Sequence, residues 1–379
     1  MILAWPHFTK IERYAVFLWL LLLAGLLFYI SYQPYIPTSA DYYYAARQWL
    51  SEQNIYQFNY EDSIHSLYFP QAVILYQPFA IFPFHLSEAI WRVFLVLLFS
   101  CSLWSFKNLI QFSEKWFYFV LTVVSAVIIV NHSLLSGQSN LAIVAFFLFA
   151  LVAISQEKWW VASIMLTFAL AFKPMIFFFL ITLLILYRPL RLKLFLLIMI
   201  LIFSPFLFGS PDYVLDQYKN FYISFFRYAQ NYSADSASLF GLLNIFVNVQ
   251  NALWWAYFLQ LGVGLLFLGC SYYVKRYYPP KLAVILIYTF GACYLLLANP
   301  ATVSNDYILL VPVLVWFAFY FYRQKIRFFA FAACIAAFCV GDLLTGLYGS
   351  SLFWLRPLTT VFFVVVLTLN LSRLRQVNL

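Results

Sequence analysis

Long apolar runs, broken by short polar loops, fill most of this chain and constrain its fold more than any other feature. Hydrophobic residues make up 65% of the 379 residues and charged residues only 9%. A soluble domain carries about 25% charged residues, and a water-soluble fold cannot bury this much apolar surface. A run of about 20 apolar residues can instead cross a bilayer. The sequence therefore predicts an all-α polytopic integral membrane protein, with residues 1–379 in a single membrane domain.

The apolar runs predict about twelve transmembrane or re-entrant helices. They lie near residues 13–31, 87–106, 116–132, 139–155, 159–172, 174–187, 190–208, 252–273, 282–298, 306–322, 327–345 and 353–371. The fifth and sixth runs are short and meet at Lys173-Pro174, which indicates a pair of half-length helices that enters the membrane only partway. The first run has no small-residue cleavage site, so we expect a retained helix and not a signal peptide.

Lysine and arginine are distributed unevenly between the predicted loops. With the N-terminus inside, most of the 22 basic residues fall in inside loops and most of the 13 acidic residues fall on or near the outside. The positive-inside rule then places both termini in the cytoplasm, and the long loops 32–71 and 209–251 on the outer face. We expect these two loops to form the active-site face of a protein in the bacterial inner membrane. The net charge of +9 follows from this bias and from anionic membrane lipid, so no nucleic-acid partner is expected.

The sequence lacks the motifs of several common chemistries. Its five cysteines all lie in apolar runs and form no CxxC pair, which indicates packing residues. It has no glycine-rich phosphate loop, no GxSxG elbow and no HExxH helix, and it contains only 4 histidines. We therefore expect neither a cofactor nor a protein-bound metal to be required.

The loop 32–71 concentrates side chains able to do acid–base chemistry. Asp41 opens the helical run 41–53, and three consecutive tyrosines follow it. The simplest role for an aspartate at a helix start is the N-cap. The alternative is a sugar site, in which Asp41 binds hydroxyls while neighbouring aromatic rings such as Tyr44 stack on the apolar face of the sugar. The residues alone leave both interpretations open.

Uncharged amides mark two other outer segments. Gln138 and Asn140 lie in the turn 136–140 between two apolar runs. They can cap the next helix, or they can hold a phosphate or a hydroxyl group. Gln71 closes the first long loop directly after Pro70 and is placed to contact a ligand.

Three charged residues complete the set of candidates. Lys173 interrupts an apolar stretch on the predicted outer side, where a lysine is costly unless it snorkels or meets an anion such as a lipid phosphate. Asp306 heads an apolar run, so its simplest role is again the N-cap. The segment 212–228 predicts an amphipathic helix on the membrane surface, whose Arg227 can touch a lipid headgroup or tail.

Four short motifs follow one another in a recognisable order. They are Asp41 with its tyrosines, Tyr68-Phe69-Pro70-Gln71, Gly137-Gln138-Ser139-Asn140 and Lys173-Pro174. In this order they resemble the DUF2029 membrane glycosyltransferases, family 87 of the GT-C superfamily, which includes polyprenol-phosphate-mannose-dependent mannosyltransferases. The resemblance extends to about Pro312. The chain departs from the family where Phe69-Pro70-Gln71 replaces Tyr-Pro-Pro, and where Asn305 or Asp306 replaces a late histidine.

The resemblance implies a GT-C fold and a sugar donor carried on a polyprenyl phosphate. It implies transfer to a glycolipid or glycan acceptor with inversion, and it favours mannose as the sugar. The essential carboxylate of the first outer loop corresponds to Asp41, which would act as the general base. A cation beside the departing phosphate suits Lys173, with Arg227 or Arg47.

Two other function classes compete with this interpretation. A lipid or glycolipid transporter, or flippase, also needs many helices, a broken helix pair and an intramembrane lysine. A ligase acting on lipid-linked glycans would have a similar outer site. The absence of an internal repeat and the crowding of polar groups on the outer face favour the transferase.

Overall fold

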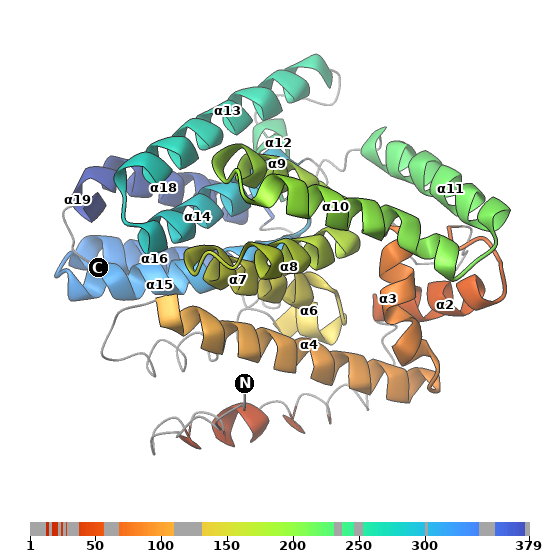
Figure 1. Ribbon diagram of the computed structural model, residues 1–379. Helices are drawn as coiled ribbons and strands as arrows, with labels where there is room; N and C mark the ends of the chain where they lie inside the picture. The colour runs from red at the N-terminus through yellow and green to blue at the C-terminus, as the bar shows by residue number, and fades with distance from the viewer. Residues whose placement is uncertain are drawn as a thin grey trace.

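The computed structural model of the protein describes residues 13–14, 17–21, 24–25, 28, 38–56, 68–109, 131–230, 237–245, 253–299, 302–340 and 353–375. Within these ranges every regular element is a helix (Figure 1). The first half contains α2 (Ser39–Leu50), α3 (Pro70–Ala80), α4 (Phe84–Phe106), η1 (Lys107–Leu109), α6 (Asn131–Leu135), α7 (Asn140–Ser155), α8 (Trp159–Phe172), η2 (Pro174–Ile176) and α9 (Phe177–Leu186). The second half contains α10 (Leu190–Phe203), η3 (Ser204–Leu207), α11 (Pro211–Gln230), α12 (Leu239–Asn244), α13 (Leu253–Tyr277), α14 (Pro280–Ala298), η5 (Ser304–Leu309), α15 (Val311–Arg323), α16 (Arg327–Val340), α18 (Leu355–Leu369) and α19 (Leu371–Arg375).

Four of the described helices are long and apolar enough to cross a membrane. They are Phe84–Phe106, Leu190–Leu207, Tyr257–Tyr277 and Pro280–Ala298. Six shorter apolar helices accompany them, at Asn140–Ser155, Trp159–Phe172, Pro174–Leu186, Val311–Arg323, Arg327–Val340 and Leu355–Leu369. The corresponding apolar runs are thus confirmed as helices, and the protein is a helical membrane protein. The count of twelve crossings stays a prediction, since the runs 13–31 and 116–132 lie largely outside the described residues.

Proline sets where several helices begin. Pro70 and Pro280 each occupy the first position of a helix, where their missing N–H would have no partner in any case. Pro174 also ends the helix before it, because the residue preceding a proline is pushed out of the helical region. Lys173 accordingly has extended backbone angles (φ −141°, ψ 118°), and α8 stops there. The break predicted at this dipeptide is confirmed.

Helix α7 forms the centre of the bundle. Almost all of its side chains are buried, and it packs against α4 and α8 and reaches α14 and η5. Several of the buried residues are alanines, among them Ala142 and Ala145, which let neighbouring helices approach closely. Because the turn 136–140 leads directly into α7, this rigid helix fixes the position of that turn.

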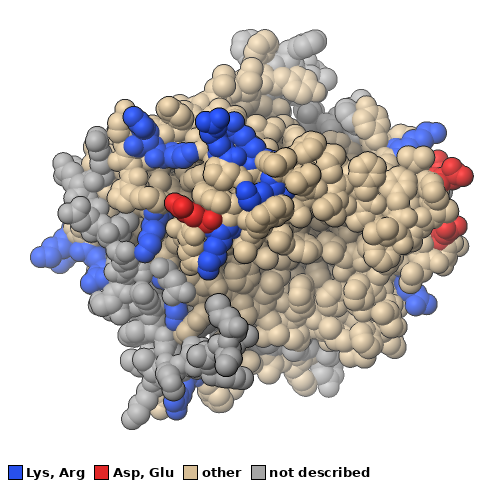
Figure 2. Space-filling model, viewed as in Figure 1, with Lys and Arg blue, Asp and Glu red and all other residues tan. Residues whose placement is uncertain are grey.

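The two ends of the bundle differ in charge. Figure 1 shows α2, α3 and α11 together at one end, which we call the site end. In Figure 2 most of the visible basic side chains gather over the opposite end, with one acidic group among them, whereas the edge near the site end carries a few side chains of both signs. We call that opposite end, which contains Arg191 at the start of α10 and Lys275 at the end of α13, the basic end. The charge asymmetry predicted from the loops is therefore present in the folded chain.

Gly291 allows α9 and α14 to approach each other closely. A Cβ atom at this position would lie 2.0 Å from a ring carbon of Phe179, far inside van der Waals contact. We predict that Gly291→Ala destabilises the protein by about 1–3 kcal/mol, the usual cost of overpacking a core. Thermal unfolding in detergent measures the effect as a lower Tm.

The matched control is Gly269→Ala in α13, because a Cβ atom there meets nothing within 4 Å. We expect this variant to be neutral or slightly stabilised, since alanine is favoured over glycine in a helix by about 1 kcal/mol. Equal Tm values for the two variants would contradict the close packing of Phe179 on Gly291.

Candidate functional site

Asp41 lies in the first turn of α2 but does not cap it. The helix begins at Ser39 with Thr38 in the N-cap position, so Asp41 is the third helical residue. Its carboxylate makes no hydrogen bond or ion pair with any residue that the structure describes. Burial raises the pKa of Asp41 from its ordinary value near 4 to about 6. The N-cap interpretation of Asp41 is therefore wrong, and its carboxylate is left available.

A buried ion pair fixes the start of α2. Arg92 and Glu88 lie one turn apart in α4 and form an ion pair, with side chains only 1% and 5% exposed. Ser39 Oγ donates a hydrogen bond of 2.6 Å to Glu88 Oε2. Arg92 donates through Nε and Nη2 to the carbonyl oxygens of Leu134 and Leu135, at 3.2 and 2.9 Å. One charge pair thus joins α4, α2 and the segment before the turn 136–140.

The turn 136–140 is held directly against α2. The Ser39 amide donates to the Ser136 carbonyl oxygen at 3.1 Å. Trp91 Nε1 donates to the Gly137 carbonyl oxygen at 2.8 Å. Gly137 has φ +66°, and a Cβ atom there would lie 2.3 Å from Ser39 Oγ. Only glycine suits this position, because it needs both a left-handed backbone and the space of a missing side chain.

Lys173 and Asp306 form a second ion pair on the other side of this turn. The Asp306 Oδ1 atom accepts hydrogen bonds from Lys173 Nζ and, at 3.2 Å, from Asn140 Nδ2. Asn140 Nδ2 also lies 3.0 Å from Gln138 Oε1. Asp306 is almost fully buried, with 3% of its side chain exposed, but Lys173 keeps 20%. An anion arriving at the site end can therefore reach the lysine more readily than the aspartate.

Asp306 also supports the start of its own helix. It is the third residue of the 3₁₀ helix η5, and its Oδ2 atom accepts from the Val303 amide at 3.3 Å. One carboxylate thus supports its own helix start and binds a lysine 133 residues away in sequence. The N-cap interpretation of Asp306 is therefore wrong, because Val303 occupies that position and Asp306 supports the helix start from the third residue.

Two tyrosines connect the Asp41 helix with the ion pair. Tyr42 donates from its hydroxyl group to Ser139 Oγ at 3.0 Å, and its ring centroid lies 4.5 Å from that of Tyr68. Burial raises the pKa of Tyr68 well above its ordinary value. The nearby Tyr42 hydroxyl and the Asp41 and Asp306 carboxylates add smaller effects in the same direction. Tyr42, which follows Asp41, thus binds Ser139, and the next residue, Asn140, binds Asp306.

The other predicted site residues lie elsewhere or have different partners. Tyr44 stacks on Phe84 with centroids 5.9 Å apart, and Arg47 is exposed near the end of α2. Gln71 is buried, and its Nε2 atom donates to the Leu201 carbonyl oxygen at 3.1 Å and to the Tyr218 hydroxyl. The predicted amphipathic segment 212–228 is confirmed as a helix, since it falls within α11, but the side chain of Arg227 lies outside the described part of the chain.

Sequence reasoning missed Glu88 and Arg92 as parts of the site. A signal for them existed, because they are two opposite charges at i, i+4 spacing inside a long apolar run. The role of Tyr42 had no comparable signal, since nothing in the sequence distinguishes it from its two tyrosine neighbours. Among the residues that the structure describes, no group of three His, Cys, Asp or Glu side chains is placed to hold a metal ion.

In its described residues the chain is thus a bundle of apolar helices that presents an unpaired carboxylate, a partly exposed lysine and clustered aromatic rings at one end, which defines a helical membrane protein with a polar cluster at that end. A model of glycosyltransferase family 87 matches residues 67–300, which is more than half of the chain. The chain therefore belongs to glycosyltransferase family 87 and is a membrane glycosyltransferase. The match includes Gln138, Asn140 and Lys173, whereas Asp41 and Asp306 lie outside it. No curated protein and no solved structure matches the chain.

The Glu88–Arg92 pair generates a stability prediction. Removing one partner leaves the other charge buried and unpaired, so Glu88→Gln and Arg92→Met should each cost about 3–5 kcal/mol. The double variant should cost clearly less than the sum of the two, with a coupling energy of about 1–3 kcal/mol. Thermal unfolding of the four proteins in detergent completes this cycle. Additive losses would show that the two side chains do not depend on each other.

Proposed function

We propose that this glycosyltransferase moves a sugar from a polyprenyl-phosphate donor to a glycolipid or glycan acceptor, with inversion at the anomeric carbon. The resemblance of its motifs to the mannosyltransferases of the family favours mannose. The observation that carries the proposal is Asp41, a carboxylate with a raised pKa and no partner among the described residues, on a helix fastened by the buried Glu88–Arg92 pair. Groups with such perturbed pKa values concentrate at functional sites.

Asp41 is suited to act as the general base. A pKa of about 6 keeps it mostly ionised at neutral pH, while making it a stronger proton acceptor than an ordinary aspartate. The acceptor hydroxyl gives its proton to Asp41, and its oxygen forms a bond to the anomeric carbon. The bond from that carbon to the donor phosphate oxygen breaks in the same step, and polyprenyl phosphate leaves with the electron pair. A single displacement of this kind inverts the configuration.

Lys173 is suited to hold the donor phosphate. An ammonium group has three hydrogen-bond donors, and Asp306 accepts from only one of them. The remaining donors can meet phosphate oxygens, since part of the Lys173 side chain is exposed. Asn140 and Gln138 lie next to the ion pair and can orient it or bind a sugar hydroxyl. Preorganised positive charge at a departing phosphate lowers the barrier because it stabilises the charge that develops there.

The two ends of the bundle face opposite sides of the membrane in this proposed function. The basic end faces the cytoplasm, and the site end faces the outside of a bacterial inner membrane, where a lipid-linked sugar is at hand and nucleotide sugars are not. The helices adopt a GT-C arrangement with both termini in the cytoplasm. The charge asymmetry between the two ends of the bundle supports this orientation (Figure 2).

Sugar transfer by purified protein tests the proposal. We predict that the wild-type protein transfers radiolabelled mannose from polyprenyl-phosphate mannose and does not use a nucleotide sugar. Asp41→Asn keeps the shape of the side chain and removes the base, so it should lower kcat by about 10²–10⁴-fold. The folded state of the variant is checked by thermal unfolding.

The matched control is Asp216→Asn, the same substitution at an exposed aspartate of α11, which should retain wild-type activity. Equal activity of the Asp41→Asn protein and the wild-type protein would contradict the role of Asp41. Movement of the intact lipid-linked sugar across a vesicle membrane, without cleavage of the sugar–phosphate bond, would favour a transporter instead.

A further inference from the structure

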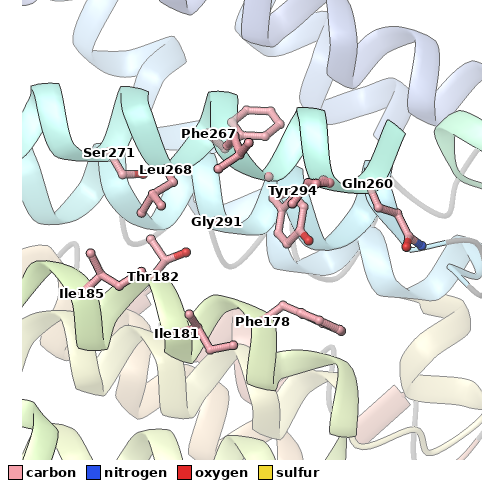
Figure 3. Close-up of a pocket in the computed structure, with 13 residues that line it drawn as sticks. Phe178, Ile181, Thr182, Ile185, Gln260, Phe267, Leu268, Ser271, Gly291 and Tyr294 are labelled. Carbon is pink, nitrogen blue, oxygen red and sulfur yellow. The ribbon is translucent and has the colours of Figure 1, made fainter. Parts of the chain in front are cut away.

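A cavity of about 150 Å³ lies between α9, α13 and α14. None of the residues assigned to the site above lines it, and Figure 3 shows apolar side chains such as Ile181 and Leu268 along the space between the helices. Apolar cavities of about this size stay dry and accept apolar ligands. The flanking helices also expose large apolar side chains, for example Phe178 at 56% and Leu261 at 61%. In a membrane, a lipid chain can therefore enter the cavity from the side.

Two cations lie beyond one end of this cavity. In Figure 3 Ser271 and Ile185 mark that end, and Gln260 marks the other. Arg191 donates through Nε and Nη2 to the carbonyl oxygens of Leu184 and Ile185, at 2.8 and 3.3 Å, so its guanidinium group sits against the end of α9.

Lys275 joins Arg191 from the facing helix. Its Nζ atom lies 4.5 Å from the ring centroid of Tyr187, the residue that follows α9, so both cations lie at the same end of that helix. In the part of the chain that the structure describes, neither cation pairs with a carboxylate. An anion bound next to two exposed cations would form charge-assisted hydrogen bonds with both and would reduce the repulsion between them.

Ser271 adds a polar group inside the cavity. Its side chain is 1% exposed, and its Oγ atom has no hydrogen-bond partner among the described residues. A buried hydroxyl group without a partner is costly, which makes an acceptor on a bound molecule favourable. Ser271 precedes Lys275 by four residues on α13, so it lies on the same face and about 6 Å deeper along the helix axis.

We propose that this cavity binds an anionic diacyl phospholipid from the leaflet at the basic end. The phosphate meets Arg191 and Lys275, an ester carbonyl of the glycerol accepts a hydrogen bond from Ser271, and one acyl chain lies between α9 and α13. The order of these groups along α13 matches the order of phosphate, ester and chain in such a lipid. A polyprenyl phosphate has no ester carbonyl to meet Ser271, so the arrangement favours a glycerophospholipid over the donor. The site requires no step of the proposed sugar transfer.

Native mass spectrometry of the full-length protein in detergent tests the site, with phosphatidylglycerol as the probe and phosphatidylcholine of the same chains for comparison. We expect one phosphatidylglycerol to bind, and Arg191→Gln with Lys275→Gln to weaken it about tenfold or more. The matched control is Lys193→Gln with Arg276→Gln, which removes the same charge at the same end. Lys193 lies over Trp160, 5.6 Å from the ring centroid, so this pair should leave binding unchanged.

The ester contact has its own test. The wild-type protein should bind phosphatidylglycerol about two- to tenfold more tightly than its ether-linked analogue, the effect of one hydrogen bond. Ser271→Ala should abolish that difference. Equal losses in the two double variants would overturn the proposal in favour of general surface charge. Displacement of phosphatidylglycerol by polyprenyl phosphate, with no preference for ester over ether lipid, would overturn it by assigning the cavity to the donor tail. Neither outcome depends on whether the protein transfers sugar.

Discussion

The buried ion pair between Arg92 and Glu88 is the interaction on which the site end depends. Two charges taken out of water are stabilised only if each is fully paired and hydrogen-bonded. Here the Glu88 carboxylate finds its extra partner in Ser39, and the Arg92 guanidinium finds its partners in the carbonyl groups of Leu134 and Leu135. Satisfying the pair therefore requires α2 and the segment before the turn 136–140 to meet at α4. Because leaving either charge unpaired would cost free energy, α2, α4 and the segment before the turn 136–140 stay in one fixed arrangement.

The turn 136–140 connects α2 with the second charge pair, Lys173 and Asp306. On one side it contacts α2 through Ser39 and Tyr42, and on the other side Asn140 binds Asp306. The two aspartates end in different states as a result. Asp306 is buried and occupied by Lys173 and Asn140, whereas Asp41 is partly exposed with no partner among the described residues. Asp41 is therefore suited to proton transfer, and Asp306 is suited to holding Lys173 in place for an anionic group.

The local features of this fold follow from its sequence, because they depend on neighbouring residues. Apolar runs predict the long helices, proline predicts where α3 and α14 begin, and Lys173-Pro174 predicts the break between α8 and α9. These signals act over one or two helical turns. The membership of the chain in its glycosyltransferase family was also evident from the order of its motifs and agrees with the family match over residues 67–300.

The connections within the site were not predictable in the same way. Lys173 and Asp306 are separated by 133 residues, and each has a sufficient local explanation, as a lysine that snorkels and as an aspartate at a helix start. Their pairing results from the packing of η5 against α7, which no local pattern encodes. The helix start predicted at Asp41 was also wrong, because the helix begins two residues earlier, at Ser39. The cause again lies far away in the sequence, because Ser39 is held by a hydrogen bond to Glu88 in α4.

The pH dependence of sugar transfer from polyprenyl-phosphate mannose is the most direct test of Asp41 as the base. Burial raises the pKa of Asp41 to about 6, and only the ionised carboxylate can accept a proton. We predict that kcat/KM is high at neutral pH and falls as the pH drops through about 6, while thermal unfolding shows that the protein is still folded. A profile that stays flat down to about pH 4, the ordinary range of an exposed aspartate, would contradict it.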